Sequence, residues 1–143
     1  MSVTVDTNVL VYDTNEDDPV HLAARDLVRR LAAGPSVLYL FWPALLGFLR
    51  IVTHPAILPR PLTPGLAVRN VEQLIRLPHV RVPGELRGFW EHYQAVAGEH
   101  TRGDDVPDAH LAALMRQHEV RGEYTRDRDF RRFEGIEVRD PTR

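Results

Sequence analysis

Short strand-forming runs alternate with longer helical segments along the whole chain, and this alternation constrains the fold more than any other feature. In the helical segments apolar residues recur every three or four positions, as Val20, Ala24 and Leu27 do. Strands that alternate with helices predict an α/β fold with a mostly parallel central sheet. The strands are expected at Val3–Val5, Val37–Phe41, His79–Val82, Glu123–Thr125 and Ile136–Val138.

Proline, aspartate and glycine delimit the predicted helices. Asp18 and Pro19 are expected to be the N-cap and first residue of a helix that Gly34 ends. The segment from Ala44 to Val52 is apolar on nearly all sides, so we expect it to be buried or covered by a partner. Further helices are predicted after a Thr63–Pro64 cap, over Glu85–Ala97, from Pro107 through Met115, and as a short helix capped by Asp127.

The composition excludes several kinds of chemistry. The 143 residues include no cysteine, which excludes disulfides and thiolate ligands, and all 18 basic residues are arginine. Without lysine there is neither a P-loop lysine nor a Schiff base. The formal net charge of −2 provides no overall basic field, so nucleic-acid binding would need a local basic patch. The length predicts a single domain over residues 1–143.

No targeting or membrane segment is recognisable in the sequence. The first residues lack both a basic segment and a long apolar stretch. The longest nearly apolar run, from Val37 to Leu49, is interrupted by Pro43 and Gly47 and is too short to span a bilayer. We therefore expect a cytoplasmic protein that does not associate with membranes.

Three aspartates occupy similar places in the predicted fold. Asp6 ends the first strand, Asp108 lies in the first turn of a helix, and Asp127 lies at a strand-to-helix turn. Because ligands bind at the carboxyl ends of parallel strands, these side chains are expected to share one crevice. Converging carboxylates repel one another unless a cation lies between them, and Mg²⁺ prefers oxygen ligands. Each aspartate is also a common helix cap, so capping alone remains an alternative.

Five motifs follow one another along nearly the whole chain: Val5–Tyr12, Gly47–Pro55, Val106–Leu114, Tyr124–Phe130 and Phe133–Val138. Each motif alone is weak. In this order and spacing, however, the chain resembles the PIN-domain family, specifically the VapC-type toxins of bacterial toxin–antitoxin pairs. The resemblance implies a three-layer α/β/α fold and a Mg²⁺- or Mn²⁺-dependent ribonuclease that hydrolyses RNA phosphodiester bonds. It also implies a homodimer and inhibition by a VapB-like antitoxin.

The resemblance also implies roles for individual residues. Asp6 and Asp108 match the principal metal ligands of the catalytic site, and Asp127 matches the additional acidic position of a T-x-D-x-D-F motif. Asn8 and Thr125 match polar residues that orient a carboxylate or a water molecule. For Asn8, a local turn between its side chain and the backbone is an equal alternative.

The helix that contains Gly47 departs from the family pattern. Many members carry a glutamate there, whereas the segment from Ala44 to Val52 contains no acid. Asp104 or Asp105 could compensate, or could serve only as loop and N-cap residues, and Asp129 either supports the site or faces solvent. One negative ligand fewer predicts weak metal affinity. It also keeps open a degenerate module that binds RNA or a protein without cleaving, while close helix packing is the rival explanation for the glycine.

Seven of the 18 arginines fall between Arg121 and Arg143, around the Asp127 turn. Arginine pairs well with phosphate, so this segment predicts a basic rim for RNA. Acids such as Glu123 and Glu134 are interleaved, and a solvated mixed-charge surface is an equal interpretation. A phosphoacceptor or aspartyl-phosphatase site is disfavoured, because such proteins generally use a lysine that this chain lacks.

Overall fold

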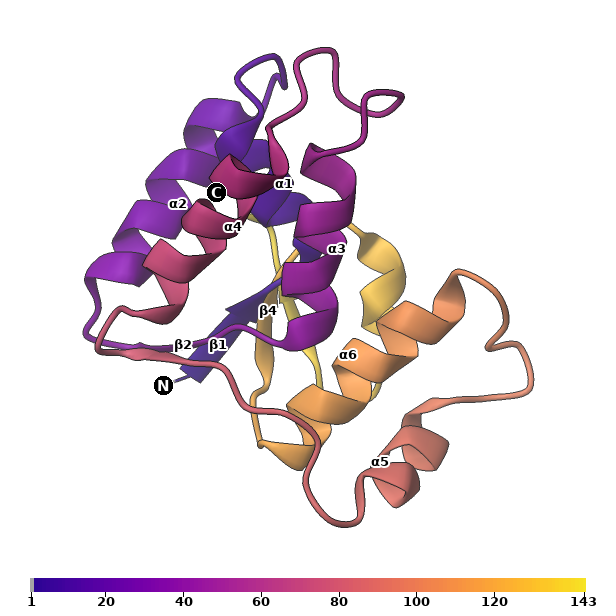
Figure 1. Cartoon of the computed structure of the whole chain (residues 1–143). Coiled ribbons are helices and arrows are strands. Elements are labelled where there is room, and N and C mark those ends of the chain that lie inside the picture. Colours follow the sequence, from indigo (N-terminus) through magenta and orange to yellow (C-terminus); the bar gives the residue numbers. More distant parts are fainter. Residues whose placement is uncertain (1) are drawn as a thin grey trace.

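A five-stranded parallel sheet forms the centre of the computed structural model, which describes residues 2–143 (Figure 1). Every neighbouring pair of strands is parallel, and the strand order is β3-β2-β1-β4-β5. All five predicted strands are present, although β2 and β3 are shorter than the sequence suggested. The strands are β1 (Ser2–Val5), β2 (Val37–Tyr39), β3 (Val80–Arg81), β4 (Gly122–Tyr124) and β5 (Glu137–Arg139).

The strand order reverses direction between β1 and β4. From β1 the chain builds outward through β2 to β3, then crosses back to place β4 on the other side of β1. Such a reversal leaves a crevice at the carboxyl ends of the two strands, because their following connections leave toward opposite faces of the sheet. Asp6 directly follows β1 and Thr125 directly follows β4. The topology therefore places both residues at this crevice.

Helices cover both faces of the sheet and bury two separate apolar clusters. The first cluster contains Val3 and Val5 of β1, packed against the helices of one face, and the second contains Phe41 and Phe130 on the other. This arrangement confirms the predicted three-layer α/β/α fold (Figure 1). The first face carries α1 (Thr7–Thr14), α2 (His21–Ala33), α3 (Trp42–Val52) and α4 (Pro64–Ile75), and the second carries α5 (Phe89–Val96), α6 (Asp105–Gln117) and the 3₁₀ helix η1 (Arg128–Arg132).

Two helix starts differ from the prediction because turns precede the helices. The prediction that Asp18 caps a helix beginning at Pro19 was wrong: α2 begins at His21, and the Asp18 carboxylate accepts the Val20 N–H at 2.9 Å. The helix expected from Glu85 begins only at Phe89, after Gly88 adopts a φ of 86°. Glycine readily adopts a positive φ, which is not helical geometry. The helix α5 therefore cannot extend past Gly88 toward the N-terminus.

The helix α6 begins at Asp105, two residues before the predicted start at Pro107. Proline is tolerated there because the first turn of a helix has no intrahelical partner for its N–H groups. The predicted cap of α4 is confirmed, since the Thr63 hydroxyl accepts the Leu66 N–H at 3.3 Å. No helix within residues 2–143 is long and apolar enough to cross a membrane.

Candidate active site

Asp6 is held at the crevice by two hydrogen bonds from different elements. Its Oδ1 accepts the Thr7 N–H at 2.7 Å and caps α1, and its Oδ2 accepts the Thr125 hydroxyl at 2.9 Å. The residue is 8% exposed. Burial raises the pKa of Asp6, the two hydrogen bonds oppose that rise, and the charge of Asp127 adds to it. Asp6 is therefore a helix cap, as the alternative interpretation expected. Its other carboxylate oxygen, however, is turned toward Thr125 at the end of β4.

Thr125 connects Asp6 with Asp127. Its buried hydroxyl donates to Asp6 and at the same time accepts the Asp127 N–H at 2.9 Å. The Asp127 carboxylate in turn accepts the Asp129 N–H at 2.9 Å, as expected for the cap of η1. This side chain and the backbone hydrogen bond from the Asp6 N–H to the Tyr124 carbonyl at 3.0 Å together hold the two strand ends that carry the aspartates.

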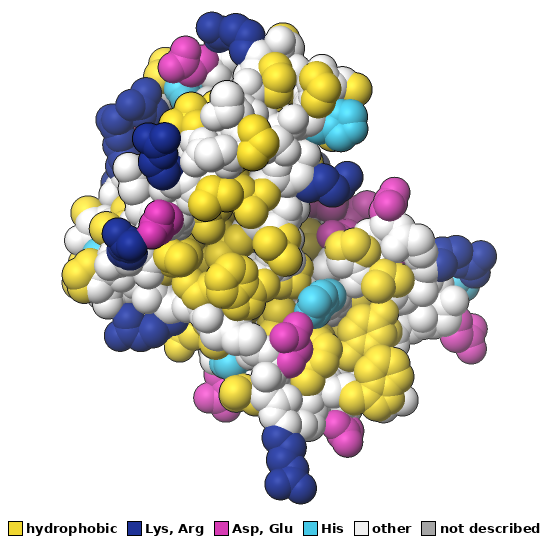
Figure 2. Space-filling view, in the orientation of Figure 1, with side chains coloured by type: hydrophobic (Ala, Val, Ile, Leu, Met, Phe, Trp, Pro, Cys, Tyr) yellow, Lys and Arg dark blue, Asp and Glu magenta, His cyan; other side chains and the backbone are white. Residues whose placement is uncertain are grey.

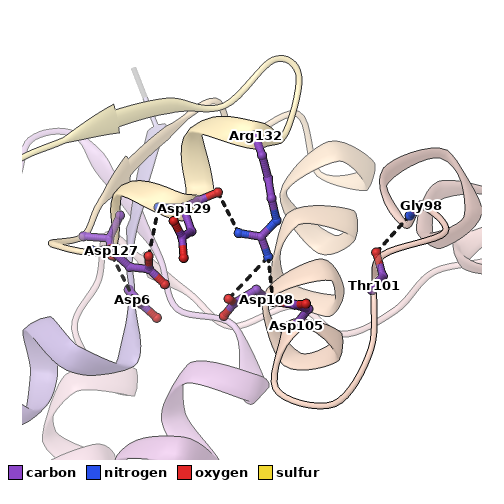
Figure 3. A network of polar contacts seen from close by, with 9 residues as sticks. Asp6, Gly98, Thr101, Asp105, Asp108, Asp127, Asp129 and Arg132 are labelled. Atoms are coloured by element: carbon purple, nitrogen blue, oxygen red, sulfur yellow. Dashed lines mark hydrogen bonds and ion pairs between the residues drawn. The ribbon is translucent and has the colours of Figure 1, made fainter.

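Asp108 enters the crevice from the first turn of α6. Burial raises its pKa to about 6, and the negative charges of Asp6 and Asp127 add to this rise while Arg132 opposes it. Arg132 extends from η1 toward α6, where its Nη2 lies 3.6 Å from carboxylate oxygens of both Asp105 and Asp108 (Figure 3). Its Nη1 donates to the Asp129 carbonyl at 2.6 Å. The three predicted aspartates therefore share one electrostatic environment at one edge of the sheet.

The remaining predicted residues lie around this group. Asn8 is half-buried in the first turn of α1, and Asp129 is exposed on η1, where its backbone groups make the contacts described above. Asp105 contacts Arg132. Asp104 occupies the N-cap position of α6, but its side chain makes no capping hydrogen bond. Figure 3 shows Asp6, Asp127 and Asp129 facing Asp108 across the crevice.

Glu123 lies close enough to the three aspartates to be affected by their charges, although no sequence motif marks it. This glutamate lies in β4, is fully buried, and neither carboxylate oxygen has a hydrogen-bond partner among the described residues. Burial raises its pKa to about 9, and the charges of Asp6, Asp108 and Asp127 add to the rise. A signal was available: a carboxylate inside a predicted central strand, two residues before Thr125, has no ordinary structural role.

Close helix packing accounts for Gly47. A Cβ atom at this position of α3 would lie 2.8 Å from the Thr7 hydroxyl and 3.2 Å from the Thr7 Cγ2 atom. The same hydroxyl donates to the Ala44 carbonyl at 3.1 Å, which fixes it against α3. Of the two explanations for the glycine, the structure favours packing of α1 on α3.

The donor atoms of the crevice suit a hard divalent cation. Carboxylate oxygens are the ligands that Mg²⁺ and Mn²⁺ prefer, and the buried carboxyl group of Glu123 adds two oxygens that have no hydrogen-bond partner among the described residues. Among residues 2–143, no group of three or more His, Asp or Glu side chains is already arranged around a common ion position. Mutual repulsion and the contact of Arg132 with Asp108 both oppose such an arrangement before a cation binds.

The match to known proteins extends over nearly the whole chain. The family model of the PIN domain matches residues 3–136. The chain belongs to the PIN-domain family. It is 53% identical over 142 residues to Ribonuclease VapC48 of Mycobacterium tuberculosis, covering 99% of this chain and 98% of that protein. This degree of identity places it among the VapC proteins.

Solved structures share the fold of this PIN domain. One is VapC20 of Mycobacterium tuberculosis, titled a sarcin-ricin loop cleaving toxin, with a TM-score of 0.66, 22% identity, and coverage of 94% of this chain and 98% of that one. Another is VapBC2 from Rickettsia felis bound to a fragment of promoter DNA, with a TM-score of 0.66, 11% identity, and 98% coverage of both chains.

A hollow of about 340 Å³ adjoins the acidic edge of this PIN domain. Its lining includes His100 and Thr101 from the loop before α6, together with Asp105, Asp129 and Arg132. A second hollow, of about 470 Å³, lies among α1, α2, α3 and α4, and none of the three aspartates lines it. None of the three aspartates lines the first hollow either, but its Arg132 contacts Asp108, so this hollow adjoins the group of aspartates.

Proposed function

We propose that this protein is a Mg²⁺- or Mn²⁺-dependent endoribonuclease, acting as the toxin of a VapBC-type pair. The observation that carries the proposal is the shared environment of Asp6, Asp108 and Asp127 at the crevice between β1 and β4. Two relatives support the proposal: VapC48 is named a ribonuclease, and VapC20 is titled a toxin that cleaves the sarcin-ricin loop.

Each side chain of the site has a defined task under this proposal. Asp6, Asp108 and Asp127 would hold the cation, and the Thr125 hydroxyl keeps Asp6 oriented toward it. When bound, the cation supplies Lewis-acid polarisation of a phosphate oxygen and lowers the pKa of a water molecule. Arg126, Arg128 and Arg131 are exposed beside Asp127 and are suited to contact the phosphates of RNA.

RNA cleavage by the purified protein tests this function. We expect cleavage of single-stranded and structured RNA in Mg²⁺ or Mn²⁺, no cleavage in EDTA, and a loss of about 100-fold or more in the Asp6→Asn variant. The alternative is a degenerate PIN domain that binds RNA or a partner without cutting. It predicts equal RNA binding by both forms and no cleavage by either one.

A VapB-like antitoxin and a second copy of the chain are the proposed protein partners. The helix α3 was expected to be buried or covered, yet Leu46 is 58% exposed and Trp42 is 41% exposed. Figure 2 shows apolar side chains gathered on the face formed by α3, and again over α5. An amphipathic antitoxin helix would cover such surface, and light scattering of the free protein and of the co-expressed pair distinguishes a homodimer from a complex.

A further inference from the structure

Glu123 is buried in a position that its own protein surroundings do not satisfy. The strand β4 lies between β1 and β5, so Glu123 is in the interior of the sheet and not at an edge. The residue is fully buried, and both of its carboxylate oxygens lack a hydrogen-bond partner in the described part of the chain. Buried polar groups almost always have partners, and a buried unpaired carboxylate is costly. Either a bound proton or a cation must therefore balance this carboxyl group.

The register of the sheet directs Glu123 toward the three aspartates. Glu123 pairs with Thr4 of β1, and the next residues on the same face are Thr125 and Asp6, whose side chains are hydrogen-bonded. Because side chains alternate between the two faces of a strand, Glu123 lies directly beneath the Thr125–Asp6 pair. The pKa of Glu123 responds to the charges of all three aspartates, in agreement with this placement. Glu123 therefore lies on the face of the sheet that carries Asp6, one residue pair below it along β1 and β4, and we call this position the floor of the crevice.

Glu123 differs from the other acids near the crevice, because it is fully buried and its carboxyl oxygens have no hydrogen-bond partner among the described residues, whereas Asp129 is exposed. A Cβ atom at position 47 would lie 2.8 Å from the Thr7 hydroxyl, so a glutamate on α3 would require the Thr7 side chain to shift. Asp104 is exposed, and Asp105 shares the contact with Arg132 that Asp108 also makes.

We propose that Glu123 is the fourth carboxylate ligand of the cation site, supplied by the floor of the crevice in place of a side chain on α3. This inference rests on the proposed metal-dependent function. It assigns the buried glutamate a role that capping and core packing leave unexplained. With Glu123 the site again has four carboxyl groups, although position 47 is a glycine.

Calorimetric titration of Mn²⁺ alone into the purified full-length protein, free of antitoxin, tests the inference. We expect Glu123→Gln and Glu123→Leu to weaken Mn²⁺ binding by about 10-fold or more, which is the scale for losing a supporting group of a metal site. Glu134→Gln is the matched control, because Glu134 is exposed on the surface after η1, and it should bind within about twofold of the wild type. The rise in melting temperature on adding Mn²⁺ should shrink in parallel.

The outcomes separate the two proposals. If Asp6→Asn loses Mn²⁺ but both Glu123 variants bind it as the wild type does, the fourth-ligand inference is overturned and the metal site survives. If the wild type binds no Mn²⁺ and cleaves RNA in EDTA, the metal dependence itself fails, and the role of Glu123 fails with it. Circular dichroism checks folding, and Glu123→Leu decides the question if Glu123→Gln does not fold, because leucine leaves no buried polar atom.

Discussion

Replacing Glu123 by leucine should change how the stability of the metal-free protein depends on pH. The pKa of this glutamate is raised from 4.5 to about 9 by burial and by the neighbouring aspartates. The folded protein therefore holds a proton that the unfolded chain has released, at every pH between these two values. Because the unfolded state binds fewer protons there, the free energy of unfolding falls as pH rises.

The size of the effect follows from the two pKa values. The contribution of Glu123 is fully present below about pH 4.5 and is lost at up to ~1.4 kcal/mol per pH unit as the pH rises toward 9. At pH 7 the wild type should have lost ~3 kcal/mol through this residue alone. Glu123→Leu removes that loss. Asp6 and Asp108 titrate in both proteins, so their contributions cancel when the free energies of unfolding of the two proteins are subtracted.

Urea unfolding followed by circular dichroism, in EDTA at pH 5, 7 and 8.5, measures this difference. We expect the variant to gain stability relative to the wild type at each step upward in pH. Mn²⁺ in place of EDTA should narrow this difference, because it stabilises the wild type more than the variant. Parallel pH profiles for the two proteins would refute the reasoning, because they would mean that Glu123 carries the same charge in the folded and unfolded states.

Three further substitutions test individual contacts. Gly47→Glu should lower the melting temperature without tightening Mg²⁺ binding, because its Cβ meets the Thr7 hydroxyl at 2.8 Å; tighter binding in a folded variant would show instead that position 47 is a vacant ligand position. Thr125→Val should cost about 1–3 kcal/mol in urea unfolding, because Asp6 Oδ2 and the Asp127 N–H both lose a partner, and an unchanged midpoint would contradict this. Leu46→Glu should leave melting and RNA cleavage unchanged but weaken binding of a co-expressed antitoxin, measured by calorimetry. Equal affinity would exclude this part of α3 from the interface.

The sequence was sufficient to predict the α/β class and the positions of the three aspartates. Strand-forming runs and helical periodicity are local signals, and Asp6, Asp108 and Asp127 each follow a strand or begin a helix. Capping chemistry is local too, which is why the caps at Thr63 and Asp127 were predicted correctly. The cap at Asp18 was wrong because a turn, which also uses an aspartate, precedes α2.

The tertiary structure alone decided which of these local features meet. The placement of β4 beside β1 brings Thr125 to Asp6 across 119 positions of sequence, and no periodic pattern specifies that pairing. The same placement buries Glu123, whose carboxyl oxygens have no hydrogen-bond partner among the described residues, although the sequence does not distinguish this glutamate from the other acids. Gly47 could be interpreted only once Thr7 was seen against it. The physical reason is the same in each case: burial and electrostatic coupling depend on neighbours in space, whereas the sequence directly specifies only neighbours along the chain.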